Sequence, residues 1–371
     1  MRFYVAVFAL LMMALAPGSP KAQQSLPLDR LRLPPGFQIE VFARVPKART
    51  MVILENWSVV LVGSRGDTIH MVIDRDRDGK VDEVAPLMTG LKSANGIAWK
   101  DGWFYVAEQH RISRFRAPDL KTLRQAKAQV LFDQLPDHPW HGWRYARFGP
   151  DGMLYVAVGS PCNVCSVSGI EGTIIRLDPA GGKPEIFASG VRNSVGFDFQ
   201  PTTGDLFFTD NGADQMGDDS PPDELNHAPA KGLWFGFPYF GGGRDRTPDF
   251  KGAPLPRKAT FPVIEFGAHV ASLGVSFYKG NQFPKTFRHD AIVAQHGSWN
   301  RSVPDGYRLM RIKFDKARGS AKAKEIFIDG WLNASGQSWG RPVDVKEMSD
   351  GSVLVSDDKA GAIYKITYRK P

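Results

Sequence analysis

A short hairpin-like pattern recurs six times along the 371-residue chain and constrains its fold more than any other feature. Each copy has a turn followed by an apolar run rich in Val, Leu, Phe and Tyr, the composition of β-strands. Three copies place Asp-Gly in the turn, where glycine supplies the positive φ that a tight hairpin needs. The copies occupy residues 55–62, 100–106, 150–156, 203–208, 288–293 and 349–355.

The spacing of the copies predicts the architecture. The early copies lie about 45 to 50 residues apart, the length of one four-stranded propeller blade. The gap between the fourth and fifth copies is nearly twice as long, which predicts a long insertion or a degenerate set of strands there. The chain has no amphipathic pattern for a helix of more than two turns. We therefore expect an all-β fold, a six-bladed β-propeller with four-stranded antiparallel blades around a central axis.

The N-terminus has the features of a secretory signal. Arg2 precedes a short apolar run over residues 3–16, and residues 17–22 contain prolines and small residues before a cleavage point near Ala22. The apolar run is too short to span a bilayer. We expect a signal peptide over residues 1–22, a single propeller domain over residues 23–371, and a periplasmic or secreted protein. An uncleaved N-terminal anchor is the alternative.

The two cysteines, Cys162 and Cys165, are spaced C-x-x-C. In an exported protein this spacing favours a disulfide, here a local staple. A zinc site would need two more ligands nearby. A covalent c-type haem needs His directly after the second cysteine, where this chain has Ser166.

The net charge of +8 comes from scattered basic residues that do not cluster beside aromatic ones. This distribution argues against a nucleic-acid-binding surface. A mildly basic balance favours an acidic redox partner or an anionic ligand.

His141 lies in a loop directly before a predicted inner strand. In a propeller, such loops surround a shared pocket at one end of the axis, so residues far apart in sequence can meet around one ligand. A histidine there is suited to act as a general base near neutral pH. A structural loop histidine is the alternative.

Arginines also occur where loops meet predicted strands. Arg192, with Asn193 beside it, precedes one apolar run, Arg341 precedes another, and Arg301 is a third candidate. If the three occupied equivalent blade positions they would converge on the axis and bind an anionic small ligand. For Arg192, a salt bridge between blades is the alternative.

Two acidic segments suggest cation sites. The denser one, residues 209–226, contains Gly212, which allows backbone carbonyls to point at an ion such as Ca²⁺. A solvated acidic loop is the alternative. The other, residues 74–79, opens like an EF-hand loop, but Ala85 stands where the bidentate Glu is required. It is expected to form a polar hairpin turn, with a weak calcium site as the alternative.

Taken in order, these segments resemble the PQQ-dependent glucose/sorbosone dehydrogenase family, especially its sorbosone-dehydrogenase-like branch. The similarity runs from residue 33 to the last blade and is most specific in residues 141–159, 192–193, 218–226 and 296–301. The resemblance implies a six-bladed propeller that binds PQQ on its axis beside Ca²⁺. It also implies oxidation of an aldose or sugar aldehyde by hydride transfer to the quinone.

The resemblance further implies roles for individual residues. His141 matches the catalytic base that takes the proton from the anomeric hydroxyl. Arg192 matches the arginine that polarises the reacting quinone oxygen, and Asn193 matches its neighbour at the cofactor. Arg341 matches an arginine that pairs with PQQ carboxylates, which are natural partners of a guanidinium. Arg301 is the nearest candidate for the family's axial lysine.

The metal ligands follow from the same resemblance, and two positions depart from it. Gly212 and Ala213 match the residues whose carbonyls hold calcium on PQQ, and Glu224 matches a ligand of a further, structural calcium. Ser160 stands where soluble glucose dehydrogenase orients its histidine with a carboxylate, so the basicity of the histidine is expected to differ. Trp140 replaces a sugar-contacting carboxylate, so glucose specificity does not transfer.

The chain carries no haem motif, so electrons are expected to pass to a separate acceptor, a cytochrome or a quinone. Two other functions fit a propeller. A calcium-dependent lactonase-like hydrolase needs carboxylates around an axial metal, whereas this chain offers basic groups there. A non-catalytic ligand-binding propeller needs neither the histidine nor the arginines.

Overall fold

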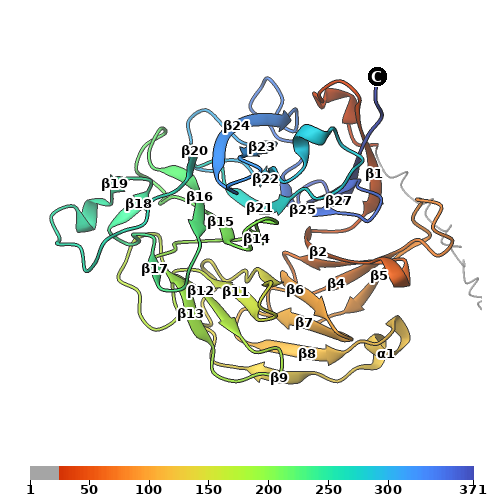
Figure 1. Cartoon of the computed structure of the whole chain (residues 1–371), viewed down its shortest axis with the longest axis horizontal. Helices are drawn as coiled ribbons and strands as arrows, with labels where there is room; N and C mark the ends of the chain where they lie inside the picture. Colours follow the sequence, from red (N-terminus) through yellow and green to blue (C-terminus); the bar gives the residue numbers. More distant parts are fainter. Residues whose placement is uncertain (1–24) are drawn as a thin grey trace, which may run out of the picture.

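A computed structural model describes residues 25–371, and these are almost entirely β-strands arranged as six sheets around a central axis (Figure 1). The predicted six-bladed β-propeller is confirmed. The expected signal peptide, residues 1–22, lies outside the described residues. Among residues 25–371, no helix is both long and apolar enough to cross a membrane.

Each blade is an antiparallel sheet of four strands. In order from the inner to the outer strand, the blades are β2 (Ala48–Leu54), β3 (Val59–Ser64), β4 (Ile69–Ile73) and β5 (Glu83–Met88); β6 (Gly96–Lys100), β7 (Trp103–Ala107), β8 (Ile112–Arg116) and β9 (Gln129–Phe132); β10 (Ala146–Phe148), β11 (Leu154–Val158), β12 (Thr173–Leu177) and β13 (Glu185–Ser189); β14 (Phe197–Phe199), β15 (Leu206–Asp210), β16 (Pro222–Ala228) and β20 (Ile264–Ala268); β21 (Ser272–Phe277), β22 (Ala291–Gln295), β23 (Arg308–Phe314) and β24 (Ala321–Ile328); β25 (Pro342–Glu347), β26 (Val353–Asp357), β27 (Ala362–Tyr368) and β1 (Phe37–Arg44).

The six sequence repeats mark one structural position, the turn that leads into the second strand of each blade. The first strands of neighbouring blades contact one another around the axis, as β2 does with β6 and β25. Loops that enter these first strands are therefore the segments that meet at one end of the axis. Apolar side chains fill the space between neighbouring sheets, so each blade completes the core of the next.

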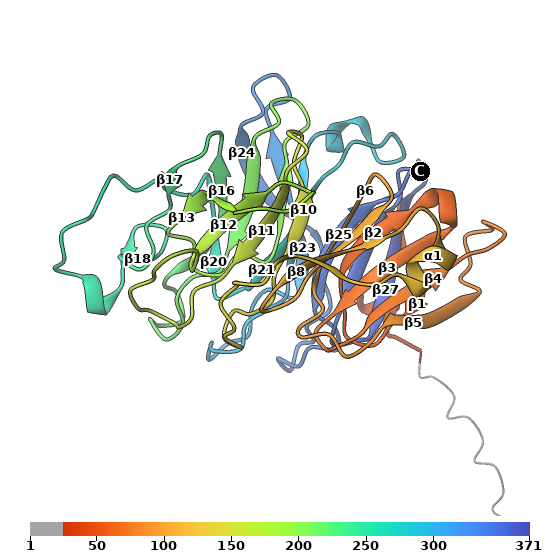
Figure 2. The same cartoon turned by 90° about the horizontal axis from the view of Figure 1, so that it is seen from below.

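The predicted long insertion lies between β16 and β20 and extends away from the blades at the left of Figures 1 and 2. Within it, β17 (Leu233–Trp234) pairs in parallel with β13 and adds a fifth strand to the third blade. The short strands β18 (Phe240–Gly242) and β19 (Asp245–Arg246) form a hairpin. The only α-helix of the described chain, α1 (Leu120–Gln125), has six residues.

The acidic run at residues 74–79 forms part of the β4–β5 hairpin, as predicted. Asp74 and Asp78 accept hydrogen bonds from the backbone N–H groups of Gly79 and Lys80, so these carboxylates support the turn. Asp74, Asp76 and Asp78 bring carboxylate oxygens within 4.8 Å of one another.

The ring is closed by the N-terminal strand. β1 pairs with β27 from Phe37 opposite Tyr368 to Arg44 opposite Ala362, so both ends of the described chain belong to the same blade. The Phe37 ring lies 4.9 Å from the Phe283 ring, 5.0 Å from Phe327 and 4.9 Å from Tyr368. Phe37 therefore links the closing strand to both the fifth and sixth blades.

Replacing Phe37 by Ala is expected to lower the free energy of unfolding by about 3 kcal/mol, because it removes the aromatic contacts that hold β1 in place. Val130, which lies on an outer strand and is 51% exposed, is the matched control, and Val130→Ala should change stability by no more than about 0.5 kcal/mol. Urea denaturation of both variants measures the difference. Equal unfolding midpoints would contradict the closing role of Phe37.

Candidate active site

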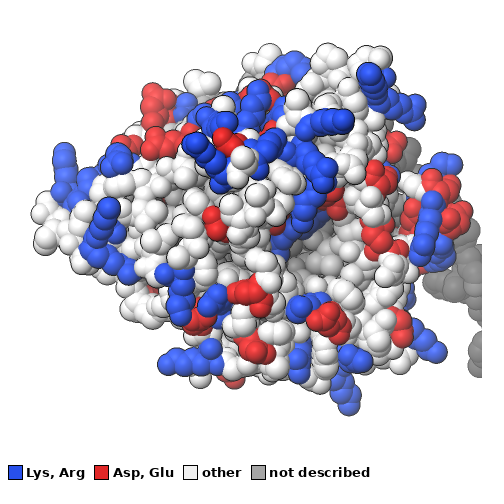
Figure 3. Space-filling view, in the orientation of Figure 1, with Lys and Arg blue, Asp and Glu red and all other residues white. Residues whose placement is uncertain are grey.

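One end of the axis contains a cavity of about 480 Å³, which opens in the central hollow of the face shown in Figure 3. Its wall includes His141, Arg192, Asn193, Gly212 and Arg341, which come from loops of the third, fourth and sixth blades. The structure thus brings together predicted residues that lie up to 200 positions apart in sequence.

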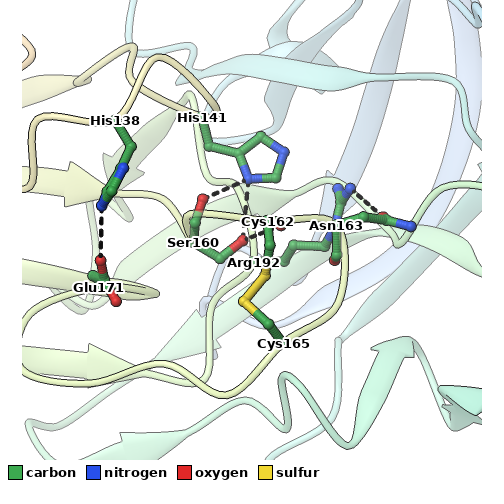
Figure 4. Close-up of a disulfide and its surroundings, with 8 residues drawn as sticks. All are labelled: His138, His141, Ser160, Cys162, Asn163, Cys165, Glu171 and Arg192. Atoms are coloured by element: carbon green, nitrogen blue, oxygen red, sulfur yellow. Dashed lines mark hydrogen bonds and ion pairs between the residues drawn. A yellow bond between two sulfur atoms is a disulfide. The ribbon is translucent and has the colours of Figure 1, made fainter. Parts of the chain in front are cut away.

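His141 is buried at the base of a loop that leads into β10. Its Nδ1 atom lies 3.0 Å from the carbonyl oxygen of Ser160 and 3.1 Å from the Ser160 hydroxyl, which itself donates to the Cys162 carbonyl. A carbonyl oxygen can only accept, so Nδ1 carries the hydrogen and Nε2 keeps a free lone pair. Figure 4 shows the ring with Nδ1 toward Ser160 and Nε2 on the opposite side.

The close approach of His141 to its supporting loop depends on Gly159. A Cβ atom at Gly159 would lie 2.5 Å from the His141 Cβ, a distance at which one residue has to move. His141 itself has a φ of 51°, in the left-handed region that side chains other than glycine rarely occupy. The backbone therefore holds His141 in a defined, costly conformation, a feature that concentrates at functional sites.

The environment of His141 keeps its imidazole neutral. Burial and the positive charge of Arg192 lower its pKa well below the ordinary value, because both disfavour the protonated ring. A neutral imidazole with a free Nε2 can accept a proton at neutral pH.

Arg192 is fixed by hydrogen bonds from all five of its N–H donors. Nε donates to the Asn163 carbonyl at 2.9 Å, and Nη1 donates to the carbonyls of Asn211 and Gly212 at 3.1 and 2.8 Å. Nη2 donates to the Asn163 side chain at 2.8 Å and to Asp214 at 2.7 Å. A hydrogen bond from Arg192 to a ligand would have to replace one of these bonds, whereas its charge acts on the cavity as it stands.

The Cys162–Cys165 disulfide is present, as predicted, with 6.1 Å between the two Cα atoms. The loop that it closes supports two site residues at once (Figure 4). Asn163, between the cysteines, binds Arg192 through its carbonyl and its side chain, and Ser160, just before them, binds His141. Asn163 was not predicted, and its position inside the C-x-x-C segment is the only sequence signal for it.

Arg341 reaches the cavity from the residue before β25, where its Nε and Nη2 donate to the carbonyls of His296 and Gly297 at 2.9 and 2.5 Å. Two further arginines line the same cavity and were missed by sequence reasoning. Arg49, at the start of the inner strand β2, forms an ion pair with Asp358 at 2.9 Å, and Arg65 follows β3. The position of Arg49 at the head of an inner strand, as for Arg341, is the signal that could have revealed it.

Arg301 does not line the cavity, contrary to the expectation that three arginines converge there. Its Nε donates to the Val303 carbonyl at 3.1 Å, and its guanidinium contacts the Asp218 carbonyl and lies 3.6 Å from Asp219. The reason is its place in the fold, since Arg301 belongs to the β22–β23 loop and does not precede an inner strand.

The predicted metal ligands fall into two groups. Gly212 lies on the cavity wall with its carbonyl hydrogen-bonded to Arg192, and Ala213 is buried beside it. Glu224 lies instead on a small buried void of about 10 Å³ that it shares with Asp210. The structure therefore separates the position of the axial cation predicted at the two carbonyls from that of the second cation predicted at Glu224.

Three buried carboxyl groups surround these positions. Burial raises the pKa of Asp210 to about 6 and that of Asp223 to about 7. Burial and the nearby Asp210 raise the pKa of Glu224 to about 8. Asp223 also accepts hydrogen bonds from the backbone N–H groups of Gly212 and Ser272 at 3.0 and 2.7 Å. Oxygen donors at this density, with little positive charge among them, are chemically suited to a hard cation.

Comparisons with known proteins agree with this picture. The profile of the family described as Glucose / Sorbosone dehydrogenase matches residues 104–365. An uncharacterised protein of Borreliella burgdorferi is 33% identical over 353 residues, which cover 92% of this chain and 91% of the relative.

Solved structures with the same fold include a calcium structure of the Trichoderma reesei carbohydrate-active enzyme of family AA12, with a TM-score of 0.78, 17% identity and coverage of 94% of this chain and 100% of the other. The holo PQQ domain of a Coprinopsis cinerea pyranose dehydrogenase has a TM-score of 0.76, 17% identity and coverage of 95% and 99%. A PQQ-bound aldose sugar dehydrogenase from Streptomyces coelicolor has a TM-score of 0.64, 20% identity and coverage of 91% and 100%.

His141 is expected to titrate below the value of about 6.5 that is usual for histidine, because burial and Arg192 both oppose its protonation. Histidine NMR spectra recorded across pH 4 to 8 measure this pKa, and the spectrum of His141→Gln assigns the resonance. A pKa of His141 at or above about 6.5 would contradict the described environment.

Proposed function

The chain belongs to the glucose/sorbosone dehydrogenase family, and we propose that it is an exported, PQQ-dependent quinoprotein that oxidises an aldose or sugar aldehyde. The observation that carries the proposal is a single axial cavity in which a buried, neutral histidine lies among four arginines. Arginines favour a polyanionic cofactor, and the histidine supplies the base that sugar oxidation requires.

The donor set of the cavity suits PQQ, a flat group with three carboxylates. Arg341 offers a guanidinium that pairs with no carboxylate among the described residues, and its two hydrogen bonds go to backbone carbonyls. The indole rings of Trp140, Trp143 and Trp299 and the side chain of Leu273 give the wall apolar surface for a planar ring system. Asn193, beside Arg192, also lines the wall and is proposed to contact the cofactor.

When bound, PQQ would supply the two-electron acceptor that takes a hydride from the sugar carbon. The protein's part is to remove the hydroxyl proton from the same substrate. We propose that Nε2 of His141 accepts it, while Nδ1–H stays hydrogen-bonded to the Ser160 carbonyl and fixes the ring orientation. A carbonyl stabilises the resulting imidazolium less than a carboxylate would, so His141 returns the proton readily to solvent.

Arg192 is proposed to act mainly through its charge. Its five donors are engaged by the protein, but its guanidinium remains on the cavity wall beside His141. A fixed positive charge stabilises negative charge that develops on an oxygen in the cavity and needs no reorganisation to do so.

The carbonyls of Gly212 and Ala213 are proposed to hold a calcium ion at the cofactor, where it would orient the group and act as a Lewis acid. Gly212 O already accepts one hydrogen bond from Arg192, which leaves its second lone pair for the ion. Glu224, with Asp210 across the small void, is proposed to bind a separate structural calcium.

An exported location is proposed from the N-terminal segment and from the disulfide, which persists in oxidising compartments. The electrons are proposed to leave to a separate acceptor, a cytochrome or a quinone, because the sequence contains no haem-attachment motif.

Apo-protein reconstituted with PQQ and Ca²⁺ is expected to reduce a dye with some aldoses or sugar aldehydes of a panel, and to need both additives. His141→Gln should still bind PQQ but lose turnover at least about 100-fold, since it removes the general base. His70→Gln, on a strand far from the cavity, is the control for loss of a histidine. Turnover without PQQ, or full turnover by His141→Gln, would contradict the proposal.

Arg341→Gln is expected to weaken PQQ binding about tenfold or more, because it removes a charge-assisted hydrogen bond to a carboxylate. Equilibrium titration of apo-protein with PQQ measures the change. Arg318→Gln removes the same charge from an exposed turn and should leave PQQ affinity unaltered. Equal affinities of Arg341→Gln and the parent protein would remove Arg341 from the cofactor site.

A further inference from the structure

The positive charges of the cavity are unequally matched. Arg192 pairs with Asp214 at 2.7 Å and Arg49 with Asp358 at 2.9 Å. Asp358 also accepts a hydrogen bond from His296 at 2.7 Å, so its oxygens are already occupied. Arg341 and Arg65 remain without a carboxylate of their own among the described residues.

Arg65 lies on the substrate-accessible rim of the cavity. Its side chain is 46% exposed, its one acidic neighbour within 4.0 Å is Asp358 at 3.8 Å, and its guanidinium makes no hydrogen bond within residues 25–371. The guanidinium lies over the Trp143 ring, 4.9 Å from the ring centroid, and Trp143 is two residues from His141. A free guanidinium is thus held on an aromatic surface next to the proposed base.

The positive surface continues beyond the cavity. Arg65 and Arg341 also line an adjoining surface depression, whose other lining residues are Lys47, Lys359 and Asp358. Lys47 and Lys359 are exposed, and the only carboxylate of the depression is the one already paired with Arg49. Figure 3 shows Lys and Arg side chains gathered beside the central hollow. We call Lys47, Arg65 and Lys359 the basic strip.

We propose that the basic strip is a binding subsite for the anionic group of the substrate, so that this protein acts on anionic sugars in preference to neutral ones. This inference rests on the proposed function and specifies its substrate class. A cofactor held within the cavity and paired with Arg341 leaves the strip, which runs outward from the rim, to the substrate. The shared chemistry is a sugar that carries a carboxylate or a phosphate, either of which a guanidinium binds in bidentate fashion.

The position of the strip relative to His141 sets the orientation of such a sugar. The end to be oxidised lies at Nε2 of His141, and the anionic group at the other end reaches Arg65 over Trp143. Lys47 and Lys359 add positive potential without rigid geometry, because lysine acts as a flexible point charge. The preference is expected to weaken with added salt, since the strip is exposed.

Glucose, glucuronate and glucose 6-phosphate form a matched series, because all three have a free anomeric end and differ in charge at the opposite end. Binding of each to the PQQ- and Ca²⁺-loaded protein is measured by calorimetry, and kcat/KM is measured in parallel. At least one anionic sugar is expected to bind at least tenfold more tightly than glucose, and the comparison of the two identifies carboxylate or phosphate.

Arg65→Gln and the double variant Lys47→Gln/Lys359→Gln are each expected to reduce that preference at least fivefold, with PQQ affinity within about twofold of the parent, because a rim charge at this exposure contributes on the order of 1 kcal/mol. Lys183→Gln, which removes an exposed charge from the β12–β13 turn, should leave the preference unchanged.

Equal binding of glucose and both anionic sugars would overturn the inference, as would a preference that Arg65→Gln leaves intact. A tenfold loss of PQQ affinity in Arg65→Gln with unchanged sugar preference would assign Arg65 to the cofactor instead. If no sugar is oxidised but an anionic sugar binds with a preference that the variants remove, the subsite stands and the proposed oxidation fails. The two failures are therefore distinguishable.

Discussion

The antiparallel pairing of β1 with β27 is the interaction on which the rest of the molecule depends, because it closes six separate sheets into a ring. The site has no continuous segment of its own. Arg49 and Arg65 come from the first blade, His141 enters the third, Arg192 enters the fourth and Arg341 enters the sixth. Only a closed ring brings these inner-strand loops to one end of one axis. The core between neighbouring sheets then fixes their relative positions.

Within the ring, the site is organised by how its charges are satisfied. Arg192 is buried and therefore needs every donor engaged, and the Cys162–Cys165 loop supplies two of its acceptors through Asn163. The same loop orients His141 through Ser160, so one disulfide-closed segment supports both the fixed charge and the neutral base. Arg192 in turn helps to keep His141 unprotonated. The protein thus separates a permanent positive charge from a group able to accept a proton, a division of roles typical of acid–base sites.

Much of this could be predicted from the sequence, because it is encoded in local patterns. Asp-Gly turns before apolar runs identified the second strand of each blade, and the C-x-x-C spacing identified the disulfide. His141, Arg192 and Arg341 were found because each lies in a loop that enters an inner strand. Arg301 does not follow that rule, since it lies in the β22–β23 loop, and the structure places it away from the cavity. Arg65 was missed for a related reason. It follows a second strand, and only the curvature of the blade brings its side chain to the rim, which no local pattern reports.

The central claim is that the axial cavity is a PQQ site. Titration of purified apo-protein with PQQ, followed by absorbance with and without Ca²⁺, tests it most directly because it depends on neither the substrate nor the electron acceptor. The account predicts saturation at one PQQ per chain, with affinity strengthened by Ca²⁺ at the carbonyls of Gly212 and Ala213. Absence of saturable PQQ binding in the presence of Ca²⁺ would contradict it.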